Sequence, residues 1–203
     1  TTSGCLNALS YCMMAVTEKG DTVAMESPVS FGMLQLAQAL GVKVLELPTH
    51  PETGVDLNAF EDALKSGEVK ASLLISNFSN PLGCCMPDEN KKAAVELSEK
   101  FNIPLIENDL NGDVYFGQRR PKSCKTYDRS GSVSKTLAPG YRVGWVVPGR
   151  FKETVLRMKL FLTIATTSIT QEVIANFLET GRYENHLRKL RHTLHGNMLQ
   201  FSR

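Results

Sequence analysis

Apolar residues recur along this chain with two alternating spacings, and the alternation predicts a succession of helices and strands. Apolar positions three or four residues apart are typical of helices, and short apolar runs bounded by turn residues are typical of buried strands. By this criterion we expect helices over residues 6–16, 31–40, 57–64 and 88–101, and a mostly helical region from 151 onward with breaks at 166–168 and 181. We expect strands over residues 22–25, 42–47, 71–76, 104–107 and 141–147.

The order of these elements predicts the fold class. Strands that alternate with helices form βαβ units, in which consecutive strands lie parallel. We therefore expect an α/β protein with a mainly parallel sheet between helices, in which Asp56 and Asp88 cap the helices that follow them. Ligands of such sheets bind at the carboxyl ends of the strands, so the residues after each strand are the first candidates for a site.

Composition narrows the class of protein. The chain has 203 residues, of which 42% are hydrophobic and 22% charged, and this is ordinary for a globular domain. A net charge of +2 gives no bulk electrostatic reason to bind nucleic acid. The five cysteines are odd in number and contain no C-x-x-C pair, which favours a reducing compartment without disulfides or zinc. With no signal peptide or membrane-spanning run in view, we expect a cytoplasmic protein.

A single lysine, Lys135, carries the strongest chemical signal. It lies in the run Ser-Val-Ser-Lys-Thr-Leu-Ala-Pro-Gly-Tyr-Arg-Val-Gly-Trp over residues 132–145. A lysine held among hydroxyl groups can form a Schiff base with a carbonyl, and the hydroxyls together with Arg142 suit a phosphate group. A lysine beside a phosphate site is what pyridoxal phosphate requires. The alternative interpretation of the run, taken alone, is a surface lysine in a Ser/Thr loop.

Three further clusters follow expected strands or open expected helices. Residues 2–7, Thr-Ser-Gly-Cys-Leu-Asn, lead into a helix, whose free N–H groups can bind an anion or serve as a simple cap. Residues 77–83 contain Asn80-Pro81 in a tight turn, which either presents an amide or is only a β-turn. Asp109 ends the strand expected over 104–107 and is either a buried, paired acid or a surface turn residue.

Taken together and in this order, these residues resemble the fold-type-I pyridoxal-phosphate enzymes of the class I/II aminotransferase family. The resemblance is strongest to the aminotransferase-like domain of MocR-type GntR transcription regulators and to 2-aminoadipate-type aminotransferases. It covers nearly the whole chain and rests on residues 2–5, 26–32, 51–57, 77–83, 134–145 and 186–191.

The resemblance implies a role for individual residues. Lys135 matches the lysine that holds the cofactor, Asp109 the acid on the pyridine nitrogen, and Asn80 the amide on the ring hydroxyl. The phosphate cradle corresponds to Ser132, Arg142 and the backbone of Cys5 and Leu6.

The chain also departs from the family pattern. Asn111 stands where a tyrosine usually bonds the ring hydroxyl, and Ser30 stands where an aromatic usually stacks on the ring, with Phe31 as the adjacent aromatic. These changes are expected to weaken catalysis more than cofactor binding. The family pattern also has about one more strand between Gly131 and Ser132, which are adjacent in this chain. We expect that the residues of this strand are omitted from the given sequence, rather than that the protein has lost them.

The resemblance implies that residues 1–203 are the large, pyridoxal-phosphate-binding domain of a longer protein. We expect a domain that senses an amino acid or amine in a homodimeric transcription regulator, with DNA bound only by a module outside this chain and no contact with a membrane. The alternative is a working aminotransferase, and a weaker third reading is a cofactor-free remnant that serves in dimer contacts. No metal is expected, because His186, His192 and His195 are interpreted as surface histidines of a basic helix, with no carboxylate or thiol that completes a ligand set.

Overall fold

The computed structural model describes residues 1–126, 137–138 and 143–201. The α-helices are α1 Cys5–Val16, α2 Phe31–Leu40, α3 Leu57–Lys65, α4 Asp88–Lys100, α5 Lys152–Thr163, α6 Ser168–Glu179 and α7 Arg182–Phe201. The strands are β1 Thr22–Ser27, β2 Lys43–His50, β3 Gly54–Val55, β4 Val69–Leu74, β5 Leu105–Glu107, β6 Leu137–Ala138 and β7 Val143–Gly144. Short 3-10 turns, η1 Cys124–Thr126 and η2 Gly149–Phe151, complete the described elements.

A five-stranded sheet organises the first half of the chain. Its order is β3-β2-β1-β4-β5, and every pair is parallel except the short antiparallel pair of β2 with β3. The expected α/β class with a mainly parallel sheet is therefore confirmed. The two-residue strand β3 was not expected, because a strand that short leaves no periodic pattern in the sequence.

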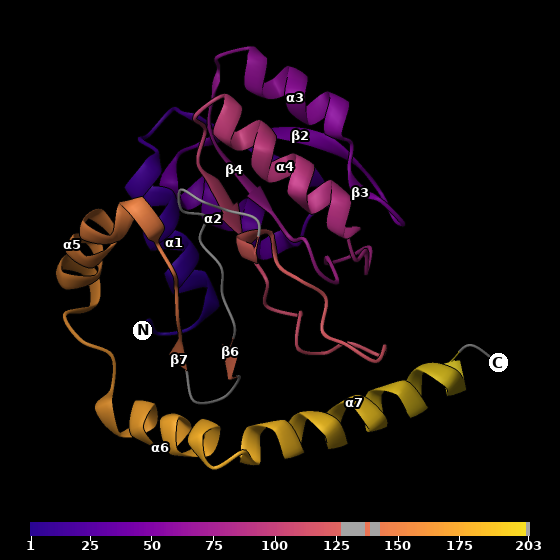
Figure 1. Ribbon diagram of the computed structural model, residues 1–203. Helices are drawn as coiled ribbons and strands as arrows, with labels where there is room; N and C mark the ends of the chain where they lie inside the picture. Colours follow the sequence, from indigo (N-terminus) through magenta and orange to yellow (C-terminus); the bar gives the residue numbers. More distant parts are fainter. Residues whose placement is uncertain (127–136, 139–142, 202–203) are drawn as a thin grey trace.

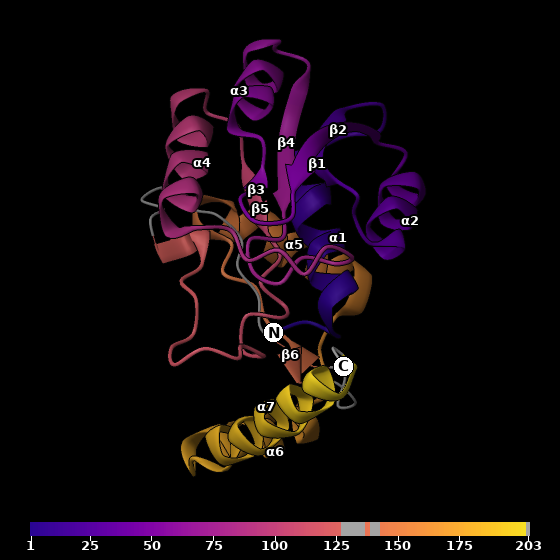
Figure 2. The ribbon, with the colours of Figure 1, turned by 90° about the vertical axis from the view of Figure 1, so that its right-hand side faces the viewer.

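Helices cover both faces of this sheet, as Figure 2 shows with α3 and α4 on one side and α1 and α2 on the other. Alternate side chains of each strand enter the two cores. Ala24 of β1 joins the core beneath α3 and α4, whereas its neighbours Val23 and Met25 join the core beneath α1 and α2. The same alternation separates Leu105 from Ile106 in β5.

The helix cap expected at Asp56 is present in the structure, and the one expected at Asp88 is not. The Asp56 carboxylate accepts hydrogen bonds from the N–H groups of Asn58 and Ala59, at 2.8 and 3.0 Å, so it caps α3 as expected. Asp88 is the first helical residue of α4, and Pro87 holds the capping position instead. The expectation for Asp88 was therefore wrong by one residue, although its charge still favours the helix start.

The chain then leaves the sheet and runs into the C-terminal helices. In Figure 1, α5 lies beside α1, and α6 and α7 extend along one side of the molecule. The helical breaks expected at 166–168 and 181 fall at the starts of α6 and α7. Among the described helices, none combines the length and apolar character needed to cross a bilayer.

Candidate functional site

The four parallel strands β2, β1, β4 and β5 end at the same edge of the sheet, and polar segments follow two of them. Residues 75–87 continue from β4, and residues 108–123 continue from β5. The two segments are tied together, because the side-chain amide of Asn111 donates a 2.8 Å hydrogen bond to the carbonyl of Phe78. The turn that contains Asn80 is thereby fixed next to the end of β5.

The start of α1 provides a place for an anion. Gly4 precedes the helix with a φ of 100° and has no side chain that could cap it. The first N–H groups of a helix have no partner inside the helix, and the helix dipole favours negative charge there. Cys5 and Leu6, the residues expected to give their backbone to a phosphate, are the first two of α1.

A backbone bridge brings a distant strand to this helix start. Thr2 and Gly144 of β7 exchange two hydrogen bonds of 2.7 and 2.8 Å. A methyl group on Gly144 would lie 3.1 Å from the carbonyl carbon of Gly4, so the absence of a side chain permits the close approach. The strand that follows Arg142 in sequence therefore runs past the start of α1.

The remaining expected residues are placed as follows. The Cys5 thiol is half-buried, and the Leu6 side chain is 47% exposed. Phe31 begins α2 and is 72% exposed, while Asn80 is exposed in its turn. Lys135, Ser132 and Arg142, like the join between Gly131 and Ser132, lie outside the described residues.

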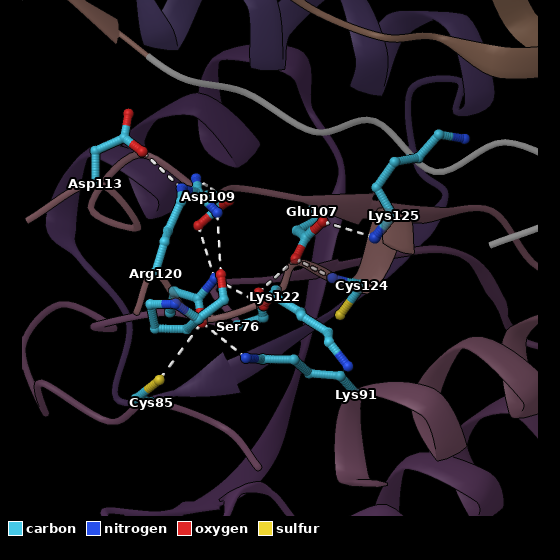
Figure 3. Close-up of polar contacts among 12 residues, drawn as sticks. Ser76, Cys85, Lys91, Glu107, Asp109, Asp113, Arg120, Lys122, Cys124 and Lys125 are labelled. Atoms are coloured by element: carbon cyan, nitrogen blue, oxygen red, sulfur yellow. Dashed lines mark hydrogen bonds and ion pairs between the residues drawn. The ribbon is translucent and has the colours of Figure 1, made fainter. Parts of the chain in front are cut away.

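Asp109 is buried and takes part in an ion pair that the sequence did not reveal. Its Oδ1 accepts a hydrogen bond from the Asn77 amide at 2.9 Å, and its Oδ2 lies 2.7 Å from Nη2 of Arg120. Figure 3 shows Arg120 between Asp109 and a second acid, Asp113, whose Oδ1 lies 2.6 Å from Nε. Burial alone would lower the pKa of Arg120, but the two carboxylates raise it, and the guanidinium stays charged.

The same network continues to α4 on one side and to α7 on the other. The oxygen of the Asn77 amide accepts a 2.8 Å hydrogen bond from the fully buried amine of Lys91. On the other side, Asp113 accepts a 3.2 Å hydrogen bond from the Tyr183 hydroxyl, and its carbonyl accepts one from Arg191 at 3.1 Å. These contacts join the end of β5 to the longest described helix.

Two further carboxyl groups are buried at this edge. Glu107 accepts hydrogen bonds from the Ser76 hydroxyl and from the backbone N–H of Cys124, and burial nevertheless raises its pKa. Burial also raises the pKa of Glu26 to about 7, against the opposing effect of a 2.9 Å hydrogen bond from the N–H of Ile75. Desolvation therefore favours the protonated form of both acids.

One residue near the start of α1 was missed by the sequence analysis. Asn108 is 4% exposed, and its Oδ1 lies 3.6 Å from the thiol of Cys5, which donates to it. Alternation along the strand is the signal that separates it from Asp109, since adjacent residues point to opposite faces. Arg120, Asn77 and Lys91 were also missed, because their partners come from separate segments.

Comparison with known proteins identifies the family. The sequence pattern of the family described as "Aminotransferase class I and II" matches residues 1–202. The uncharacterized HTH-type transcriptional regulator YjiR of Escherichia coli (strain K12) is 39% identical over 207 residues, which cover 99% of this chain and 44% of YjiR. The chain spans less than half the length of the curated relatives it matches.

Solved structures share the fold. Kynurenine aminotransferase from Pyrococcus horikoshii, solved in complex with PMP, has a TM-score of 0.86 and 26% identity over 94% of this chain and 50% of its own. LysN, an alpha-aminoadipate aminotransferase from Thermus thermophilus complexed with N-(5'-phosphopyridoxyl)-L-leucine, has a TM-score of 0.86 and 25% identity over 94% of this chain and 51% of its own.

These matches indicate pyridoxal phosphate as the cofactor. Among the described residues, those at the start of α1 fit its phosphate group. The uncapped start of α1, the positive φ of Gly4 and the close approach of Gly144 suit a phosphate group. The fit does not extend to Asp109, whose two carboxylate oxygens already have partners. With the match over residues 1–202 and the shared fold, the chain belongs to the aminotransferase class I and II family.

Proposed function

We propose that this chain is the cofactor-binding, effector-sensing domain of a MocR-type transcription regulator of the GntR class. The observation that carries the proposal is the joint match: an aminotransferase family pattern over residues 1–202, and 39% identity to an HTH-type regulator over 99% of the chain. In this proposal residues 1–203 form the large domain, and the DNA-binding module and a smaller domain belong to other parts of a longer protein.

The start of α1 supports phosphate binding in this proposal. The backbone N–H groups of Cys5 and Leu6 donate to the phosphate, and the helix dipole adds a favourable charge. Ser132 and Arg142 complete the cradle with a hydroxyl and a bidentate guanidinium. The bridge between Thr2 and Gly144 supports this role, since it brings β7 to the same helix start.

The remaining residues orient the cofactor ring and attach it. Asn80 directs its amide to the ring oxygen from a turn that Asn111 holds beside β5. The amine of Lys135 would hold the cofactor covalently. When bound, pyridoxal phosphate supplies a carbonyl carbon that exchanges amines, so the effector is an amino acid or amine. We infer a homodimer as the working form.

The first experiment tests cofactor attachment in the full-length protein. After incubation with pyridoxal phosphate and reduction by borohydride, peptide mapping is expected to find the cofactor on Lys135. The Lys135→Ala protein is expected to lose the adduct, and Lys92→Ala, which removes a lysine 62% exposed on α4, is expected to keep it. An adduct that persists in Lys135→Ala contradicts the assignment.

A second measurement separates a sensor from an enzyme. The proposal predicts that one amino acid or amine changes the affinity of the full-length protein for its DNA target and that transamination is slow. The solved aminotransferases with a TM-score of 0.86 favour the alternative, a working aminotransferase. Turnover with 2-oxoglutarate at an ordinary enzyme rate, on the order of 1–10³ per second, would establish that alternative.

A further inference from the structure

The two residues that follow β5 point to opposite faces of the sheet. Leu105 belongs to the core beneath α3 and α4, and Ile106 belongs to the core beneath α1 and α2. Because side chains alternate along an extended strand, Asn108 shares a face with Ile106, and Asp109 shares a face with Leu105. The side-chain contacts of both residues agree with this assignment.

Asn108 faces the side on which the phosphate end of the site lies. Its Oδ1 accepts the thiol hydrogen bond of Cys5, the first residue of α1, at 3.6 Å. Its position is fixed by its backbone, whose N–H donates a 2.9 Å hydrogen bond to the carbonyl of Leu74. Among the described residues, none accepts a hydrogen bond from Nδ2 of Asn108, so no described side chain competes with a ligand for this donor.

Asp109 points to the opposite face, where both of its carboxylate oxygens have partners. Its side chain is 3% exposed, one oxygen accepts from Asn77 at 2.9 Å, and the other accepts from Arg120 at 2.7 Å. Gly112 closes this arrangement, since a methyl group there would lie 2.2 Å from Oδ1 of Asp109. To reach a ligand at the start of α1, this carboxylate would have to break a buried ion pair and cross the sheet.

We propose that Asn108, and not Asp109, faces the ring nitrogen of pyridoxal phosphate in this chain, so that the cofactor is held with its ring nitrogen unprotonated. This inference rests on the proposed function, since it requires the cofactor to bind with its phosphate at the start of α1. It revises the assignment of Asp109 that the family resemblance implies.

The exchange of a carboxylate for an amide changes what the site can do. A carboxylate favours the protonated form of the ring nitrogen, whereas an amide N–H donates to its unprotonated form. The unprotonated ring is a weaker electron sink, so removal of a proton from the amino acid is slowed, while exchange of one amine for another is retained. The second residue after Asn108 is Leu110, which has no donor for the ring oxygen. This site suits an amine sensor.

The test uses the full-length protein loaded with pyridoxal phosphate labelled with ¹⁵N in its ring. Solid-state NMR at pH 7 reads the protonation of that nitrogen directly. The wild-type protein is expected to show the unprotonated signal, and Asn108→Asp is expected to show the protonated signal and to bind the cofactor roughly tenfold more tightly, because a neutral hydrogen bond becomes a charge-assisted one. The adjacent variant, Asp109→Asn, is expected to keep the wild-type signal and to unfold at a lower temperature.

Each outcome decides between the two residues. A protonated signal in the wild-type protein that is lost in Asp109→Asn would overturn the inference, and so would an Asn108→Asp protein with an unchanged signal. If Asp109→Asn does not fold, the comparison of wild type with Asn108→Asp still decides. A wild-type protein that takes up no cofactor, seen in the loading step, overturns the proposed function and the inference with it.

Discussion

The sheet with its four helices and the C-terminal helices use apolar residues in different ways. In the first region large side chains such as Phe60 and Leu73 are completely buried. In the C-terminal region, Phe161 of α5, Ile164 just after it and Ile169 of α6 are 75–77% exposed. Both regions show helical periodicity, but only in the first region are the apolar faces of the helices largely buried, against the sheet.

This difference separates the prediction of a helix from the source of its stability. The spacing of apolar residues predicts where a helix forms, whereas most of its stability comes from packing of its apolar face. The sheet region therefore contains most of the buried apolar residues, and the described C-terminal helices add only Val155, Ile174 and Leu187 to them.

Two phenylalanines test this difference between the regions most directly. Phe60→Ala is expected to lower the free energy of unfolding by about 3–5 kcal/mol, because it leaves a cavity in a closed core. Phe161→Ala is expected to change it by less than about 0.5 kcal/mol, because the side chain is largely in solvent. Urea denaturation followed by circular dichroism measures both, and similar losses in the two variants would contradict the distinction.

The buried ion pair tests whether the network at the sheet edge is structural. Asp109→Ala removes one acceptor from each of Arg120 and Asn77, which keep Asp113 and the carbonyl of Lys122, and we expect a loss of about 3 kcal/mol in the free energy of unfolding. Asp62→Ala removes an acid that is 77% exposed and is expected to cost less than about 1 kcal/mol. The same urea titration applies, and a loss for Asp109→Ala no larger than that for Asp62→Ala would show that the pair contributes little.

Glu26 is expected to make the sheet region less stable as the pH rises. Below pH 4.5 its carboxyl is protonated in both states, and between pH 4.5 and about 7 the unfolded chain releases a proton that the folded chain keeps. Folding stability therefore falls across this window, by about 3 kcal/mol when complete.

The variant Glu26→Gln cannot ionise, so its stability relative to wild type is expected to increase from pH 4.5 to 7 and then level off. Thermal unfolding across this pH range measures the difference. An exposed acid serves as the control, and Glu68→Gln is expected to run parallel to wild type. A Glu26→Gln curve that also runs parallel to wild type would show that the side chain is not desolvated.

The smallest expected effect concerns the glycine beside the ion pair. A methyl group at Gly112 would lie 2.7 Å from Nη2 of Arg120 as well as against Asp109, so Gly112→Ala is expected to cost about 1–3 kcal/mol. Gly117→Ala meets nothing within 4 Å and is expected to be nearly neutral. Equal melting temperatures for these two variants would mean that residues 110–120 accommodate the added methyl group without loss of stability.

Much of the fold could be predicted because it depends on local patterns. The expected helix over 6–16 is α1 to within one residue, and the expected breaks near 166–168 and 181 separate α5, α6 and α7. Of the strand expected over 141–147, residues 141–142 lie outside the described residues, Val143 and Gly144 form β7, and residues 145–147 are not in a strand. Pairing with a partner decides the length of a strand, and apolar character alone does not determine it.

The candidate site follows from a rule of topology, whereas its side-chain contacts could not be predicted from the sequence. The carboxyl ends of parallel strands located the segments after β4 and β5, because that rule depends only on topology. The choice between Asn108 and Asp109 depended on the face to which each points, and the partners Asn77 and Arg120 come from other segments. Contacts between distant segments have no periodic signature, so the sequence did not indicate that Asp109 was already paired.

The bridge between Thr2 and Gly144 has a consequence for the order in which the site is assembled. During synthesis the start of α1 emerges early, but its partner in β7 is made only after the whole sheet region. Contacts between residues so far apart in sequence form slowly, because a long loop must close before they are gained. A nascent chain can therefore fold its sheet before β7 reaches the start of α1, so under the proposed function cofactor capture is expected to be a late event in the biogenesis of this protein.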